Sequence, residues 1–145
     1  MKLQNLLLDR PTPEEKAEGE LPRVKVCDFG LSHIREGQLD GKSRMETRCG
    51  TMGYIAPEVG PKNSIIGPEI DMWAFGVMLY EMCTAYKPTV LQNYRYGQGP
   101  IPYRKQDWKK HDSAIQDLIN SCLEIDPNKR LTPDDALQHP WFETE

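Results

Sequence analysis

The amino-acid sequence predicts a mainly α-helical domain with one small β-hairpin near its N-terminus. Two stretches, residues 70–84 and residues 113–123, have the apolar pattern of helices. Two short apolar runs, Leu6 to Leu8 and Val24 to Cys27, are long enough to pair as strands. With 145 residues the chain can bury a core as a single domain.

Residues 10–23 separate the two expected strands and are rich in Pro and Glu. A stretch of this composition cannot bury a core, so we expect a solvated loop. Such a loop is either a tolerated surface insertion or a docking segment, and the sequence leaves both interpretations open.

A second polar stretch covers residues 35–48. It contains Gly37 and Gly41 and shows neither a helical nor an alternating apolar period. We therefore expect an exposed and mobile segment between the hairpin and the helices.

Residues 70–84 are apolar on nearly every side of a helix. Such a helix belongs in the middle of a core, so this stretch is the expected structural axis. Asp71 is the only acid in its first turns. Buried together with the helix, its carboxylate needs hydrogen-bond donors.

The next region is irregular before the helical pattern returns. Residues 88–102 are interrupted by glycines and prolines, and we expect only one short helix around Val90 to Tyr94. Ser113 and Gln116 then form a predicted capping box. The apolar residues that follow repeat at helical spacing and define one buried face: Ile115, Leu118, Ile119, Cys122 and Leu123.

A last helix is expected near the C-terminus. Thr132 is its predicted N-cap, Pro133 its first residue, and Asp135 lies in its first turn. Pro140 ends the helix after His139.

The charge of the chain argues against nucleic acid as its main partner. The formal net charge is −4 and the pI is about 5.4, which lacks the basic excess that phosphate-backbone binding requires. The first ten residues hold only a short apolar run, too short to span a membrane and without a signal-peptide cleavage pattern. We expect neither a membrane partner nor a targeting segment.

The cysteines do not form a metal or disulfide pattern. No CxxC pair occurs, and no histidine lies at metal-ligand spacing from Cys27, Cys49, Cys83 or Cys122. Reduced thiols are typical of the cytosol and the nucleus. We expect the chain to be cytoplasmic, with the nucleus as the second compartment.

A specific resemblance emerges from motifs spread over the whole chain. Taken in order, they resemble the signature of the eukaryotic protein kinase family. The resemblance implies that residues 1–145 form part of a protein kinase domain, the C-terminal lobe beginning within the catalytic loop, without the N-terminal lobe. The motif residues are Lys2, Asn5, Asp28, Phe29, Gly30, Gly50, Thr51, Tyr54, Ala56, Pro57, Glu58, Asp71, Trp73, Gly76 and Arg130.

The resemblance implies a magnesium and ATP site at the hairpin. Asp28 corresponds to the ligand of the metal that bridges the β- and γ-phosphates, and Asn5 to the second metal ligand. The two should meet across the strand pair. Lys2 stands where serine/threonine kinases keep a lysine that contacts the transferring phosphate, and Gly50-Thr51 also fits that branch.

Three residues near the expected metal site have roles in nucleotide binding and switching by the same resemblance. Leu7 is expected beneath the adenine ring, although strand packing alone selects a leucine equally well. Phe29 is expected to pack into an internal hydrophobic spine, and Gly30 to give the turn its freedom. Cys27 either faces the nucleotide or is a small buried apolar residue.

The resemblance makes residues 28–58 the activation segment. Thr47 is the expected regulatory phosphosite, modified by an upstream activating kinase, because a phosphate there could order the segment by recruiting basic groups. Thr51 is expected beside the catalytic aspartate and Lys2, where it shapes the floor under the acceptor residue.

Other family residues have structural roles. Glu58 and Arg130 resemble a buried ion pair that ties the activation segment to the base of the lobe. Asp71 resembles the residue that holds the backbone of the catalytic loop. His139 is expected to be a structural hydrogen-bonding group.

The sequence also departs from the family pattern. The catalytic aspartate would stand immediately before Met1, so Met1 is interpreted as an internal methionine used as a start. The glycine-rich loop, the strand lysine and its glutamate partner do not occur in these 145 residues.

The resemblance implies a serine/threonine protein kinase that uses ATP and Mg²⁺ and acts on protein substrates. We expect the chain by itself to be inactive. The alternative is a kinase-like scaffold, a binding module that acts through its helical surface.

Overall fold

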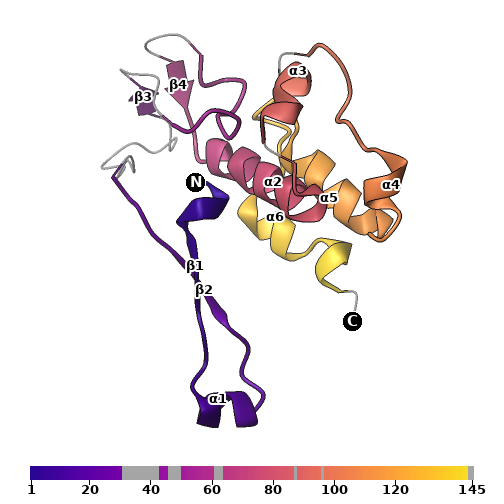
Figure 1. Ribbon diagram of the computed structural model, residues 1–145. Coiled ribbons are helices and arrows are strands. Elements are labelled where there is room, and N and C mark those ends of the chain that lie inside the picture. Colours follow the sequence, from indigo (N-terminus) through magenta and orange to yellow (C-terminus); the bar gives the residue numbers. More distant parts are fainter. Residues whose placement is uncertain (31–42, 46–49, 61–63, 87, 96, 144–145) are drawn as a thin grey trace.

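The computed structural model describes residues 1–30, 43–45, 50–60, 64–86, 88–95 and 97–143. Its helices form one body, and a β-hairpin projects from that body (Figure 1). Near the N-terminus lie the 3₁₀ turn η1 (Leu3–Asn5), β1 (Leu6–Asp9), α1 (Pro13–Ala17) and β2 (Arg23–Val26), followed by β3 (Ser43–Met45) and β4 (Ser64–Ile66). The helical body consists of α2 (Glu69–Thr84), η2 (Pro88–Leu91), α3 (Gln92–Arg95), α4 (Lys105–Trp108), α5 (Ser113–Cys122), α6 (Pro133–Leu137) and η3 (Pro140–Phe142).

The predicted strand pair is confirmed. β1 and β2 pair antiparallel, with Leu6 opposite Val26 and Leu7 opposite Lys25. All four residues of β2 are exposed, as are three of the four in β1. The hairpin therefore stands away from the helices and keeps little contact with the core.

The spacer between the strands is more regular than expected. Residues 13–17 form the short helix α1 at the tip of the hairpin, rather than a loop throughout (Figure 1). A capping box explains this correction, since the Thr12 hydroxyl accepts from the Glu15 backbone N–H and the Glu15 carboxylate accepts from that of Thr12. The helix is solvated, as its composition predicts.

A second small sheet replaces part of the expected irregular segment. β3 and β4 pair antiparallel, with Arg44 opposite Ile65. Three residues of the 35–48 stretch are thus extended strand, and the rest of that stretch lies outside the described residues.

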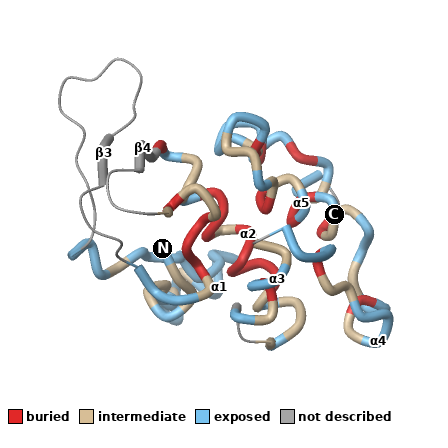
Figure 2. The backbone as a smooth tube through the Cα atoms, turned by 90° about the horizontal axis from the view of Figure 1, so that it is seen from above, coloured by how far each residue is buried: buried red, intermediate tan, exposed pale blue. Residues whose placement is uncertain are grey.

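α2 is the structural axis, as predicted from its apolar surface. Trp73, Val77 and Tyr80 are fully buried on it. Buried positions concentrate along α2 and α5 (Figure 2). A Cβ added at Gly76 would lie 2.7 Å from the Cβ of Cys122, so only glycine lets these two helices approach so closely.

α5 has the predicted apolar face but a different cap. Its N-cap is Asp112, whose carboxylate accepts from the Ala114 N–H at 3.0 Å. Ser113 is the first helical residue, and its hydroxyl donates to Asp112 at 3.2 Å. The predicted Ser113 and Gln116 capping box is therefore wrong, because Asp112, one residue earlier, occupies the N-cap position and Ser113 already lies within the helix.

The predicted start of the last helix is confirmed, but α6 ends at Leu137, and Pro140 begins η3 instead of ending the helix after His139. Thr132 caps α6 by accepting from the Asp135 N–H, and Pro133 is its first residue. His139 is buried and hydrogen-bonded, with Nδ1 accepting from the Trp141 N–H and Nε2 3.3 Å from Asp117. Within the described parts of the chain, no helix is long and apolar enough to cross a membrane.

Candidate functional site

The base of the hairpin brings together two polar side chains that are distant in sequence. Asn5 ends η1 just before β1, and Asp28 follows β2 by two residues. Asn5 Nδ2 lies 3.3 Å from Asp28 Oδ2, and the Cys27 N–H donates to the Asn5 carbonyl at 2.9 Å. The two side chains thus meet across the strand pair, as the sequence predicts.

The backbone at Asp28 is unusual. Its φ is +63°, in the left-handed region that non-glycine residues rarely enter, although aspartate tolerates it better than most. Such a conformation costs about 1–3 kcal/mol and persists where the surroundings enforce it. Here the chain turns sharply just after β2, at the residue whose carboxylate contacts Asn5.

The chemistry of this pair suits a hard cation. An amide oxygen from Asn5 and a carboxylate from Asp28 are ligands that Mg²⁺ prefers. Among the described residues, no group of three or more His, Cys, Asp and Glu side chains could hold a metal. Two protein ligands nevertheless fit Mg²⁺, which usually keeps several waters and binds substrate phosphates.

The remaining residues predicted at this site are less closely grouped. Lys2 precedes η1, and its carbonyl accepts from the Asn5 N–H at 3.0 Å. Leu7 is 54% exposed on β1. Thr51 is exposed, and its carbonyl accepts from the Tyr54 N–H. No hydrogen bond or ion pair among the described residues joins Lys2 to Thr51, so their joint role remains a prediction.

Two predictions of burial are wrong. Phe29 is 67% exposed instead of packed in an internal spine, because it lies at the base of the hairpin where no described helix covers its ring. The Asp71 side chain is 66% exposed, although its neighbours Met72 and Trp73 are buried, and its carboxylate lies 3.9 Å from the terminal ammonium of Met1. The role of Asp71 in holding the catalytic loop remains a prediction.

The predictions for two other residues of the 28–58 stretch, Thr47 and Gly30, stay predictions. Thr47 lies outside the described residues. Among the described residues, a Cβ at Gly30 would meet only Asp28 Oδ1, at 3.4 Å, which is ordinary contact. The freedom of Gly30 to switch remains a prediction.

The predicted pair of Glu58 and Arg130 is present. Arg130 Nη1 lies 2.6 Å from Glu58 Oε1, and Nη2 lies 2.9 Å from Oε2, which is a bidentate ion pair. Arg130 also donates to the carbonyls of Glu124 and Glu69. Its side chain is fully buried, and its guanidinium lies 5.2 Å from the ring centre of Trp73. The pair ties residues 50–60 to α2 and to the end of α5.

A second tie was missed by sequence reasoning. The Tyr54 hydroxyl donates to the Glu81 carboxylate on α2. Burial, and then Glu81, raise the pKa of Tyr54 to about 12, while hydrogen bonds with the Leu3 backbone and the Gln4 side chain act in the opposite direction. Tyr54 thus connects α2 to the turn that carries Asn5. Glu81 is the only acid within residues 72–84, and that was the available signal.

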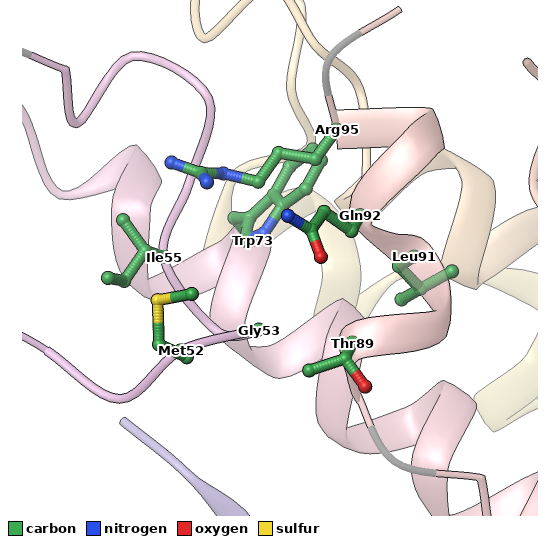
Figure 3. A pocket seen from close by; sticks show the side chains of 8 residues that line it. All are labelled: Met52, Gly53, Ile55, Trp73, Thr89, Leu91, Gln92 and Arg95. Atoms are coloured by element: carbon green, nitrogen blue, oxygen red, sulfur yellow. The ribbon is translucent and has the colours of Figure 1, made fainter. Parts of the chain in front are cut away.

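A pocket lies where residues 50–60 meet the short helix α3 (Figure 3). Arg95 on α3 donates to the Ala56 carbonyl at 3.1 Å and closes one side of it. The indole Nε1 of Trp73 is buried without a hydrogen-bond partner in the part of the chain that the structure describes. The lining residues are Met52, Gly53, Ile55, Trp73, Thr89, Leu91, Gln92 and Arg95.

Comparison with known proteins places the whole chain in one family. Residues 1–142 match the family described as protein kinase domain. The liver/testis isoform of the phosphorylase b kinase gamma catalytic chain from Rattus norvegicus is 31% identical over 99% of this chain and 34% of its own length.

Two other similar proteins are also protein kinases by name. Calcium/calmodulin-dependent protein kinase cmkB of Emericella nidulans is 35% identical over 98% of the chain and 34% of the relative. The type IV enzyme of that name from Homo sapiens is 34% identical over 97% of the chain and 28% of the relative. The chain thus spans about a third of the length of the curated relatives that it matches.

Proposed function

Because this chain belongs to the protein kinase domain family, we propose that it supplies the metal-binding and activation-segment part of a serine/threonine protein kinase. The proposed reaction transfers the γ-phosphoryl group of ATP to serine and threonine hydroxyls of protein substrates, with Mg²⁺ as the cofactor.

The juxtaposition of Asn5 and Asp28 carries this proposal. Phosphoryl transfer depends on holding phosphates and metal in place while their charge is neutralised. The hairpin holds an amide and a carboxylate within hydrogen-bond distance of each other. Bound there, Mg²⁺ would neutralise phosphate charge during transfer.

Within this mechanism the residues of the chain bind and orient. Asn5 and Asp28 hold the metal, and Lys2, three residues before Asn5, contributes a positive charge for the transferring phosphate. Leu7 supplies an apolar surface for the adenine ring. Lys2 and Thr51 together support the preference for serine and threonine acceptors.

We assign the 145-residue chain by itself no phosphoryl transfer activity. Its sequence contains neither a His-Arg-Asp triplet nor a glycine-rich phosphate loop. Leu7 and Phe29 are more than half exposed, so a nucleotide and a metal bound beside them would remain accessible to water. Transfer from ATP to a protein substrate by the purified chain at a rate above buffer would refute this assignment.

Metal binding is testable without activity. Paramagnetic Mn²⁺, which prefers the same oxygen ligands, should broaden the amide resonances of residues 5 and 26–28 in the chain. The Asp28→Asn variant should lose this broadening. The matched control is Asp9→Asn, which removes an exposed carboxylate paired with Lys25 on the same hairpin and should leave the broadening unchanged.

Equal broadening in wild type and Asp28→Asn would exclude a metal site at this pair. Loss of broadening in Asp9→Asn as well would indicate nonspecific attraction to hairpin carboxylates. Both results argue against the kinase mechanism at this hairpin, whatever the activity of longer forms.

Regulation at Thr47 is a separate part of the proposal. We assign Thr47 as the site that an upstream kinase phosphorylates, because it lies four residues before Thr51 in a polar stretch with Arg44 and Arg48 as nearby cations. Mass spectrometry of the active protein from its native cells should find phosphate on Thr47. An unmodified Thr47 in active protein would remove this assignment.

Free cysteines support a reducing compartment. Cys27, Cys83 and Cys122 carry free thiols in the described part of the chain. We therefore assign the protein to the cytoplasm or the nucleus, where thiols stay reduced. Imaging of the tagged protein in its native cells tests this.

The second candidate function is a binding module. Leu7, Leu8 and Val24 are all more than half exposed on the hairpin, and such apolar surface can bind a protein partner. Mn²⁺ binding that depends on Asp28 favours the kinase, since a pure scaffold has no need of a metal site.

A further inference from the structure

A group of basic side chains surrounds α4, outside the candidate site. We name it the α4 basic platform: Arg104, Lys105, Lys109 and Lys110. All four residues are exposed, although the chain as a whole has a net charge of −4. α4 lies at the end of the helical body away from the N-terminus in both views (Figures 1 and 2).

The platform is held rigidly although α4 is too short to be stable alone. Trp108, at the end of α4, is 5% exposed. Its ring packs edge-on against Tyr103 at 4.7 Å and lies 5.8 Å from Tyr80 on α2. The Tyr103 hydroxyl donates to Asn120 on α5 at 2.8 Å. The aromatic cluster therefore anchors α4, and with it the basic residues, to α2 and α5.

Among the described residues, the nearby acids form no ion pair with the platform. The Tyr86 hydroxyl donates to the Asp107 carboxylate at 3.1 Å, so that acid is engaged on the inner side of α4. Asp112 is held as the N-cap of α5, where its carboxylate accepts from the Ala114 N–H at 3.0 Å. Arg104 lies over the Tyr86 ring, with its guanidinium 4.9 Å from the centroid.

The three lysines are the free charges of the platform. Within the ranges that the structure describes, neither Lys105 nor Lys109 nor Lys110 forms an ion pair. Lysine is a compact charge on a flexible stem, so it accommodates carboxylates in several geometries. Three such charges on a fixed support form a preorganised surface for an anionic ligand.

We propose that the α4 basic platform docks a short acidic segment of a protein partner, rich in aspartate or glutamate. The length of the ligand follows from electrostatics. Charges separated by more than about 8 Å are largely screened at physiological ionic strength, so a short acidic segment responds to the local positive charge. An extended polyanion, such as a nucleic acid or a membrane surface, is also repelled by the net negative charge of the rest of the chain.

The chemistry of the platform further disfavours single-stranded nucleic acid. Binding of that ligand relies on aromatic rings on which bases can stack. The tryptophan of α4, Trp108, is buried against Tyr103 and Tyr80, so its ring is unavailable for stacking. An acidic peptide needs only the lysine ammonium groups.

The binding of fluorescein-labelled octaglutamate to the 145-residue chain, followed by fluorescence anisotropy, tests this proposal. The variant with Lys105→Gln, Lys109→Gln and Lys110→Gln should bind about tenfold more weakly or worse. The matched control carries Arg10→Gln, Lys16→Gln and Lys129→Gln, the same change in net charge at distant exposed positions, and should lose less than about twofold. Labelled octaglutamine should not bind.

Mapping the binding site by chemical shifts on the wild-type chain does not depend on whether the variants fold. Addition of octaglutamate should shift the amide resonances of residues 104–110 and leave those of β1 and β2 unchanged. Equal weakening in both triple variants, no binding of octaglutamate, or shifts elsewhere would overturn the proposal. Tighter binding of phosphatidylserine vesicles than of octaglutamate through the same lysines would also overturn it, in favour of a membrane surface.

Discussion

Arg130 shows how single side chains organise this molecule. Its guanidinium is fully buried and reaches Glu58, the Glu69 carbonyl and the Glu124 carbonyl, which belong to three separate parts of the chain. A buried charge is tolerated only when it is paired and hydrogen-bonded. Arg130 meets this condition through acceptors as far as 72 residues away in sequence.

Replacement of Glu58 should therefore strongly destabilise the fold. Glu58→Ala leaves Arg130 buried without its counter-ion, and we expect the free energy of unfolding to fall by about 3–5 kcal/mol. Urea denaturation measures this. The control is Glu20→Ala, which breaks an exposed pair with Arg23 and should change stability little. Similar losses in the two variants would show that burial is not the source of the effect.

A second prediction at the residue scale concerns Tyr54 and the dependence of stability on pH. Its pKa is about 12 in the fold, above the value of about 10 for an exposed tyrosine. The folded state therefore binds this proton more tightly, so the contribution is complete below about pH 10 and is lost as pH rises towards 12. The stability of wild type should fall more steeply between pH 10 and pH 12 than that of Tyr54→Phe.

Denaturation curves of the two proteins at several pH values give this comparison. The other tyrosines titrate in both proteins, so the difference isolates Tyr54. Parallel pH dependences would mean that the Tyr54 proton is not held by the fold.

At the scale of elements, the contact between α2 and α5 sets the core. Gly76 is needed there, because its Cβ would approach the Cβ of Cys122 to 2.7 Å. Gly76→Ala should cost about 1–3 kcal/mol from overpacking, despite the higher helix propensity of alanine. Gly30→Ala, whose added Cβ makes one ordinary contact with the described residues, at 3.4 Å, should cost much less in the same thermal unfolding measurement. A neutral or stabilising Gly76→Ala would contradict the close packing.

The elements that sequence predicts well are those with local signals. α2, α5 and α6 follow from apolar periodicity and from Thr132 as a cap, and the hairpin follows from two apolar runs. The N-cap of α5 was displaced by one residue, since Asp112 and Ser113 are both good caps and only geometry decides between them. α1 was missed because its composition is that of a loop.

Side-chain environments were harder to predict. Exposure depends on what covers a residue in space, and so Phe29 and Asp71 were assigned to a core that they do not enter. The bond between Tyr54 and Glu81 spans 27 residues and has no sequence period. Asn5 and Asp28 were placed together correctly, because strand pairing fixes their separation.

At the scale of the whole molecule, stability should be uneven. The helical body buries α2 completely along much of its length, whereas the two-stranded hairpin is exposed on nearly every residue. A two-stranded hairpin is only marginally stable in water. We expect the amides of Val77 and Tyr80 to exchange slowest with deuterium, and those of Leu7 and Val24 to exchange among the fastest. Comparable protection in both parts would show that the hairpin is stabilised as strongly as the core.

The hairpin has one consequence for how this protein can change over evolutionary time. The distance between Asn5 and Asp28 is set by the pairing of β1 with β2 and by the bond from Cys27 to Asn5, all of which lie within residues 5–28. The helical body contacts this turn through Tyr54, which interacts with Leu3 and Gln4, but the bonds that set the distance lie within the hairpin itself. Substitutions that give the helical body new surfaces, such as that around α4, should therefore leave the spacing of the two side chains largely unchanged.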